Sequence, residues 1–173
     1  MAFRITRLAL SAFFAISIHG IATAADDEKK AAVASEEDGK YFDADGNPTF
    51  KIENGTVDWY TFSGYRRYHS DCHVCHGPDG MGSSYAPRLV ESMKNLDYPT
   101  FISIVAEGRK NVGGGKENVM PAFGDNKNVY CYLDDIYVYL RARAVGAAPR
   151  GRPPKKADKP EAAKVHEASC MGG

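Results

Sequence analysis

The sequence predicts an all-α fold of three to four helices joined by long loops. Two observations lead to this prediction. Apolar and aromatic side chains recur at helical spacing in three segments, and the stretches between those segments are rich in glycine, proline and serine. Three helices with long loops form a weak core for a body of roughly 100 residues, so we expect a bound group to fill the centre.

The first predicted helix runs from Thr56 to about Cys72. Thr56 is of a residue type that caps helix N-termini, and Asp58 lies in the first turn. Aromatic residues then recur at helical spacing: Trp59, Phe62, Tyr65 and Tyr68. Before this helix, residues 40–56 contain two short aromatic or β-branched runs around an Asp-Gly-Asn-Pro turn, which predicts a small hairpin.

Two further helices follow. One is predicted from about Tyr98 to Glu107, because Pro99 suits a first helical position and Gly108 suits the end of a helix. The last runs from about Asn128 to Ala144, where apolar and polar groups alternate with helical period. The glycine-rich stretch between these two helices is predicted to be a loop.

The two ends of the chain differ from its body. Residues 1–24 are predicted to be a signal peptide, since arginines precede a short apolar run and a small-residue cleavage site. The run is too short to span a bilayer, so we expect an exported protein without stable membrane insertion. Residues 25–39 are expected to be a flexible lead-in, residues 40–146 the folded domain, and residues 147–173 a Pro/Lys-rich tail that is disordered or an extended linker.

Charge is divided unevenly along the chain. Residues 25–140 carry 19 acidic and 12 basic side chains, whereas residues 141–173 carry 3 acidic and 8 basic ones. An acidic body repels phosphate, and the basic side chains lie in the Pro/Ala-rich tail. The distribution therefore disfavours nucleic-acid binding.

The motif Cys72-His73-Val74-Cys75-His76 is the most informative stretch. A zinc site needs four ligands, but Cys131 and Cys170 are too far apart to form a second pair. A thioredoxin-like dithiol requires a βαβ setting, which the sequence does not show. The spacing C-x-x-C-H is the signature of covalent haem attachment, in which two thiols bond to the haem and the adjacent histidine binds its iron. We therefore expect one haem c.

A low-spin haem needs a sixth ligand, and Met120 is the best candidate. It lies in the predicted loop, well after His76, and is followed by a stiffening proline. The other methionines after the predicted signal peptide are Met81, Met93 and Met171. Met81 is too close to His76 in sequence, Met93 suits a packed position, and Met171 lies in the tail.

The chain resembles the class I c-type cytochromes over about residues 56–144. Gly64 and Tyr68 match that family's first helix, and Tyr139-Leu140 resembles the helix it packs against. Pro87 and Leu89, in the sequence Ala-Pro-Arg-Leu, match a family motif. By that likeness the Pro87 carbonyl accepts a hydrogen bond from His76, and Leu89 packs on the haem.

A closer resemblance, to the four-cysteine cytochromes of methanol metabolism in methylotrophic bacteria, begins at Tyr41 and so includes the stretch before the first predicted helix. It implies that Cys131 and Cys170 are the third and fourth cysteines, which can form a disulfide in an oxidising periplasm. It also implies a quinoprotein methanol or alcohol dehydrogenase as electron donor and a downstream cytochrome c or oxidase as acceptor.

Together these features predict a periplasmic one-electron carrier and not an enzyme. With both axial positions of the iron filled, no site for a substrate is left. Two alternatives stay open at this stage. The chain could be a cytochrome subunit of a larger redox complex, or a haem enzyme or gas binder in which Met120 does not bind the iron.

Overall fold

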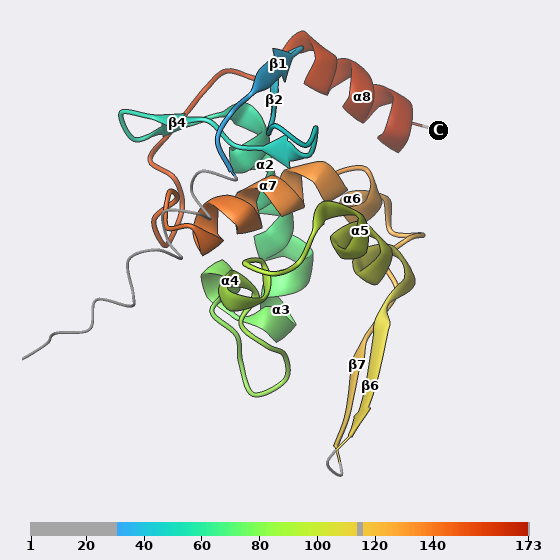
Figure 1. Cartoon of the computed structure of the whole chain (residues 1–173). Coiled ribbons are helices and arrows are strands. Elements are labelled where there is room, and N and C mark those ends of the chain that lie inside the picture. Colours follow the sequence, from blue (N-terminus) through green and yellow to red (C-terminus); the bar gives the residue numbers. More distant parts are fainter. Residues whose placement is uncertain (1–30, 114–115, 173) are drawn as a thin grey trace, which may run out of the picture.

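The computed structural model of the chain describes residues 31–113 and 116–172 (Figure 1). The predicted signal peptide and the first part of the lead-in lie outside the described residues. Helices make up most of the regular secondary structure among the described residues, as predicted, but three small sheets accompany them, with strand orders β1-β2-β3, β4-β5-β8 and β6-β7. Within the described ranges, no helix is long and apolar enough to cross a membrane.

The first predicted helix is present but is built from three pieces. A single helical run comprises α2 (Trp59–Arg67), a π-helical turn η1 (Tyr68–Cys72) and α3 (His73–His76). The predicted cap was wrong: Asp58 is the N-cap, and its carboxylate accepts from the backbone N–H of Thr61 at 2.8 Å. Thr56 instead belongs to strand β5, where it pairs with Glu53.

The second predicted helix is confirmed as α5 (Tyr98–Glu107), with a proline in its first turn and Gly108 at its end. The third divides into α6 (Lys127–Tyr130) and α7 (Leu133–Ala144), so the predicted continuous helix is broken at Cys131 and Tyr132. A short α4 (Leu89–Ser92) precedes α5, and a 3-10 turn η2 (Pro78–Gly80) follows the cysteine motif.

The core is organised around the contact of α2 with α7. Gly64 permits this contact, because a Cβ atom built on it would lie 1.8 Å from the carbonyl oxygen of Asp135. One turn later, the fully buried rings of Tyr68 and Tyr139 pack with centroids 5.6 Å apart. These are the pairings that the family resemblance implied.

Short strands hold the N-terminal segment and the start of the domain. Strands β1 (Ser35–Glu37), β2 (Lys40–Phe42) and β3 (Pro48–Thr49) form one antiparallel sheet, and the β2–β3 pair is the predicted small hairpin. Because β1 lies within residues 25–39, the expectation of a wholly flexible lead-in was wrong for that part. Strands β4 (Ile52–Glu53) and β5 (Thr56–Val57) form a second hairpin.

The predicted loop between α5 and α6 contains a hairpin. Strands β6 (Arg109–Gly113) and β7 (Lys116–Met120) pair from Arg109 opposite Met120 to Gly113 opposite Lys116. Figure 1 shows this hairpin projecting away from the helices. The residues on either side of residues 114–115 therefore pair as strands, where the sequence predicted a loop.

The tail prediction was also wrong. Residues 155–156 form strand β8, which pairs in parallel with β5, and the chain then forms helix α8 (Glu161–Met171). Cys131 and Cys170 are joined by a disulfide with Cα atoms 5.9 Å apart. Proline and lysine content suggested disorder, but contacts with the domain order this segment.

Candidate functional site

The two cysteines of the motif lie on the helical run that begins with α2. Cys72 ends the π-helical turn and Cys75 lies in α3, so their side chains leave the helix within one turn of each other. Neither cysteine is in a disulfide: Cys72 is partly buried against the core, and Cys75 is exposed. The motif thus presents two unpaired thiols on one short helical segment.

His76 is buried and held in one orientation. Its Nδ1 lies 3.1 Å from the carbonyl oxygen of Pro87. Since a carbonyl oxygen only accepts, Nδ1 carries the proton, and Nε2 is left with the lone pair that a metal ion requires. The hydrogen bond implied by the resemblance is therefore present.

The loop after the motif is fixed by hydrogen bonds to the motif's backbone. The Gly82 N–H donates to the His76 carbonyl at 2.7 Å. The Ser83 hydroxyl donates to the Cys75 carbonyl and accepts from the Tyr85 N–H. These bonds return the chain towards the motif, so that Pro87 reaches His76.

Leu89 and Met120 come from distant segments but pack against the same core. Leu89 begins α4, and Met120 ends β7 at the base of the projecting hairpin. Both are partly buried against the cluster of core residues that Cys72 also touches. The residues present fit a haem, because one thiol, a thioether and an apolar side chain adjoin one core, and the second thiol and the oriented imidazole follow Cys72 in α3.

Two alternatives for the motif lose support. Burial, with smaller effects of Asp71 and Cys75, raises the pKa of the Cys72 thiol to about 12. A redox-active dithiol needs at least one thiol that ionises easily, and burial opposes that role for Cys72. A structural zinc site needs four ligands, and in the part of the chain that the structure describes no group of three or more His, Cys, Asp or Glu side chains is placed to hold a metal ion.

Two buried tyrosines form hydrogen bonds with the turn that follows the motif. The Tyr68 hydroxyl donates to the Gly77 carbonyl and accepts from the Gly80 N–H at 3.0 Å, so α2 holds the turn directly after His76. The Tyr139 hydroxyl of α7 donates to the Asp79 carboxylate at 3.3 Å. Both helices of the core therefore fix the position of the turn that follows the motif.

Sequence reasoning missed Asp79. Its buried carboxylate accepts from the Gly151 N–H at 3.0 Å and lies 3.4 Å from both His69 Nε2 and Arg150 Nε. Burial alone would raise its pKa, but the Gly151 hydrogen bond and the charges of His69 and the arginines hold it below its usual value. The turn sequence Gly-Pro-Asp-Gly was the sequence signal that could have found it, and in the structure this aspartate has a positive φ.

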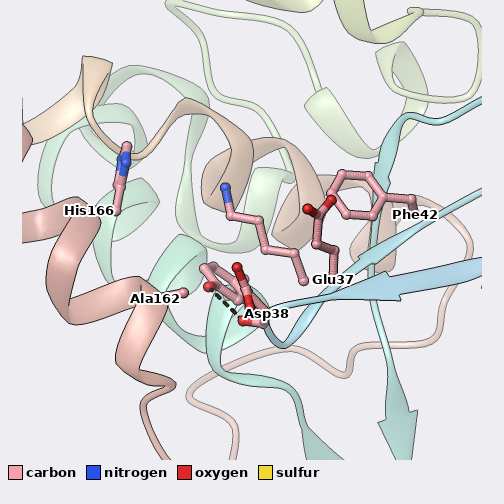
Figure 2. A pocket seen from close by; sticks show the side chains of 7 residues that line it. Glu37, Asp38, Phe42, Ala162 and His166 are labelled. Atoms are coloured by element: carbon pink, nitrogen blue, oxygen red, sulfur yellow. Dashed lines mark hydrogen bonds between the residues drawn. The ribbon is translucent and has the colours of Figure 1, made fainter.

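A groove of about 220 Å³ lies elsewhere, between the first sheet and α8 (Figure 2). Its lining residues are Glu37, Asp38, Lys40, Phe42, Tyr60, Ala162 and His166. Several of these are already bonded: Lys40 pairs with Asp134 at 3.1 Å, and His166 Nε2 lies 2.9 Å from the Cys131 carbonyl. None of the predicted site residues lines this groove, which is a seam between the tail and the domain.

Comparisons with known proteins agree with the motif. The family described as "Cytochrome C oxidase, cbb3-type, subunit III" matches residues 62–140. Cytochrome c-553I of Paracoccus denitrificans is 55% identical over 138 residues, which are 79% of this chain and 61% of that protein. Cytochrome c-555 of Methylococcus capsulatus is 38% identical over 96 residues, which are 55% of this chain and 72% of that protein.

A solved structure extends the comparison to the fold. The c-type cytochrome XoxG from Methylobacterium extorquens AM1 matches with a TM-score of 0.79 and 60% sequence identity. The match covers 84% of this chain and 90% of that one. The fold of this chain is therefore similar to that of a solved c-type cytochrome. The chain spans only about three fifths of the length of cytochrome c-553I.

Proposed function

Because the chain belongs to the c-type cytochromes, we propose that it carries single electrons in the periplasm between a quinoprotein dehydrogenase and a downstream acceptor. It is an electron carrier and not an enzyme, and as a c-type cytochrome it holds haem c covalently. The bound haem supplies the chemistry, which is reversible one-electron exchange at its iron.

The proposed donor is a methanol or alcohol dehydrogenase that contains pyrroloquinoline quinone. This donor is supported by the resemblance of the stretch from Tyr41, and of the four-cysteine pattern, to cytochromes of methanol metabolism. The proposed acceptor is another cytochrome c or a terminal oxidase. Redox partners of this kind meet over small interfaces, and charge governs how fast they meet.

We assign the haem to one site. Cys72 and Cys75 form the thioether bonds, and His76 and Met120 bind the iron. Pro87 orients the imidazole of His76 and raises its basicity, while Leu89 covers part of the haem. The observation that carries this assignment is the 3.1 Å hydrogen bond that fixes His76 beside two unpaired thiols.

Spectroscopy of the purified protein tests the ligands. Oxidised protein should show the weak far-red band of a methionine-ligated ferric haem, and the Met120→Ala variant should lose it and bind carbon monoxide when reduced. The matched control is Met93→Leu, which changes a buried core methionine and should keep the band. Loss of the band in the control, but not in Met120→Ala, would overturn the assignment.

Mixing experiments test the partner. Dehydrogenase with methanol should reduce the cytochrome rapidly, with a rate that depends on ionic strength because the encounter is steered by charge. A wild-type protein with the expected spectrum that the dehydrogenase fails to reduce would refute the donor while leaving the haem site intact.

A second candidate function is a subunit of a larger redox complex. The observation that favours it is the match of residues 62–140 to a family described as an oxidase subunit. Gel filtration of the native periplasmic fraction separates the two. A free carrier elutes at the size of the single chain, and a subunit co-elutes with its complex.

A further inference from the structure

The C-terminal segment carries a run of fixed positive charges that the proposed site does not use. We define the basic strap as residues 150–159, which contain Arg150, Arg152, Lys155, Lys156 and Lys159. Figure 1 shows the segment passing along the side of the molecule near β4 before it enters α8. Sequence alone suggested a mobile tail here, so its fixed position changes what these charges can do.

Backbone hydrogen bonds hold the strap at two points. At its start, the Gly151 N–H donates to Asp79 at 3.0 Å. Further along, β8 pairs with β5, and the Ala157 N–H donates to the Val57 carbonyl at 2.8 Å. The disulfide at Cys170 secures the helix that follows.

Aromatic rings of α2 fix several of the basic side chains. The Arg152 guanidinium lies 5.4 Å from the centroid of the Phe62 ring. The Lys156 and Lys159 ammonium groups lie 5.0 and 5.5 Å from the Trp59 ring. Cation–π contacts stabilise a charge over an aromatic ring even at exposed sites, so they favour one placement of each charge.

Part of this charge is not neutralised within the protein. Arg150 pairs with Asp79, and Lys159 pairs with Glu167. Arg152, Lys155 and Lys156 are exposed and form no ion pair with any residue that the structure describes. Three cations therefore lie within five residues of a fixed backbone without carboxylate partners among the described residues.

We propose that the basic strap is a docking surface for the acidic face of a protein redox partner. This inference rests on the proposed function and adds the surface through which a partner is recognised. Charges that are already ordered lose little side-chain entropy when a partner binds, and they speed its approach. The salt bridge of Arg150 with Asp79, three residues after His76, ties the start of the strap to the loop that follows the motif.

An acidic protein fits the strap better than a membrane does. Anchoring on a lipid surface usually combines basic residues with large apolar side chains that enter the bilayer. Among the described residues, the exposed large hydrophobic side chains are Val33, Val74, Tyr85, Val119, Tyr130 and Val165, and none lies in the strap.

The test compares three forms of the haem-loaded mature protein. One carries Arg152→Gln, Lys155→Gln and Lys156→Gln, and its matched control loses three exposed basic residues outside the strap, by Arg66→Gln, Lys94→Gln and Lys127→Gln. The probe is poly-L-glutamate at low ionic strength. Wild type should bind it, the strap variant about 10-fold more weakly, and the control within 2-fold of wild type.

A second variant excludes a trivial effect of lost packing. Lys155→Glu reverses a charge at an exposed side chain that stacks on no ring among the described residues, so the strap stays folded. Lys155→Glu should weaken poly-L-glutamate binding at least as much as Lys155→Gln alone does. Equal binding by wild type, Lys155→Glu and the triple variant would overturn the proposal.

Two further arms identify the partner class. Vesicles of phosphatidylglycerol that bind wild type more tightly than poly-L-glutamate, and lose binding in the strap variant, would also overturn the proposal in favour of a membrane surface. Reduction by dehydrogenase and methanol should slow about 10-fold in the strap variant only. If no form is reduced, the proposed donor fails while the poly-L-glutamate result still decides the docking surface.

Discussion

The α2–α7 contact and the C-terminal segment both pack on the same domain, but different information specifies them. In the α2–α7 contact, each partner is a helix whose apolar spacing is visible locally, and Gly64 marks where the two meet. The C-terminal segment has the composition of a disordered linker, yet it forms β8 and α8. Its order comes from residues that are distant in sequence, namely Asp79, Val57 and Cys131.

The difference shows that composition indicates whether a segment folds by itself. It does not indicate whether contacts with the rest of the domain order that segment. Residues 147–160 contain too few apolar side chains to form a core of their own. A buried carboxylate, an open strand edge and a covalent bond each supply free energy that does not depend on local apolar content. Three experiments separate the two kinds of order.

The largest effect is expected from Gly64→Ala. The added Cβ would lie 1.8 Å from the Asp135 carbonyl oxygen, which is backbone and cannot move aside as a flexible side chain would. The helices must separate, and we expect the free energy of unfolding to fall by about 3 kcal/mol or more. Urea unfolding followed by circular dichroism measures it.

The matched control is Gly146→Ala. Gly146 has φ +78° and no other atom within 4 Å of the added Cβ, so only the backbone conformation is penalised. That variant should lose about 1 kcal/mol. An equal decrease in the free energy of unfolding in the two variants would show that the lack of a side chain at Gly64 does not determine how closely α2 packs against α7.

Removal of the disulfide should have the next largest effect. The double variant Cys131→Ser, Cys170→Ser opens a loop of 39 residues and should lower the free energy of unfolding by roughly 2–3 kcal/mol. Limited proteolysis should then cut within α8 but leave α2 and α7 intact. Protection of α8 equal to that in wild type would mean that β8 and Asp79 suffice to order the segment.

The smallest effect concerns a charge buried at the α2–α7 contact. Burial raises the pKa of Asp135 to about 7, although a hydrogen bond with Ser63 opposes the shift. An unfolded aspartate has a pKa of about 3.9, so the unfolded chain releases this proton first, and stability is lost as pH rises from about 4 to 7. Asp135→Asn should therefore exceed wild type in stability by roughly 1–3 kcal/mol at pH 8, with little difference at pH 4.

Unfolding measured across this pH range gives the result directly. Asp158→Asn, at an exposed strap position, is the control and should show no such rise. A stability difference between wild type and Asp135→Asn that stays constant from pH 4 to 8 would mean that Asp135 is ionised throughout.

Much of the candidate site could be predicted from sequence because its chemistry is local. Cys72, Cys75 and His76 are fixed relative to one another by a single helical turn, and the boundaries of α5 follow from Pro99 and Gly108. Predictions failed where pairing between strands decides the structure. The β6–β7 hairpin shows little period-2 alternation, and its glycines resemble a loop until the two strands are paired.

The sequence by itself determined the motif and the three helical segments, because helical spacing and covalent chemistry act over a few neighbouring residues. The pairing of Cys131 with Cys170 was implied only by the family resemblance. Only the tertiary structure decided that Asp79 binds the tail, that Pro87 reaches His76, and that the basic strap is fixed on Trp59 and Phe62. Each of these depends on a contact between segments far apart in the chain. Such contacts form only when the packed helices supply the position and the burial that make them favourable.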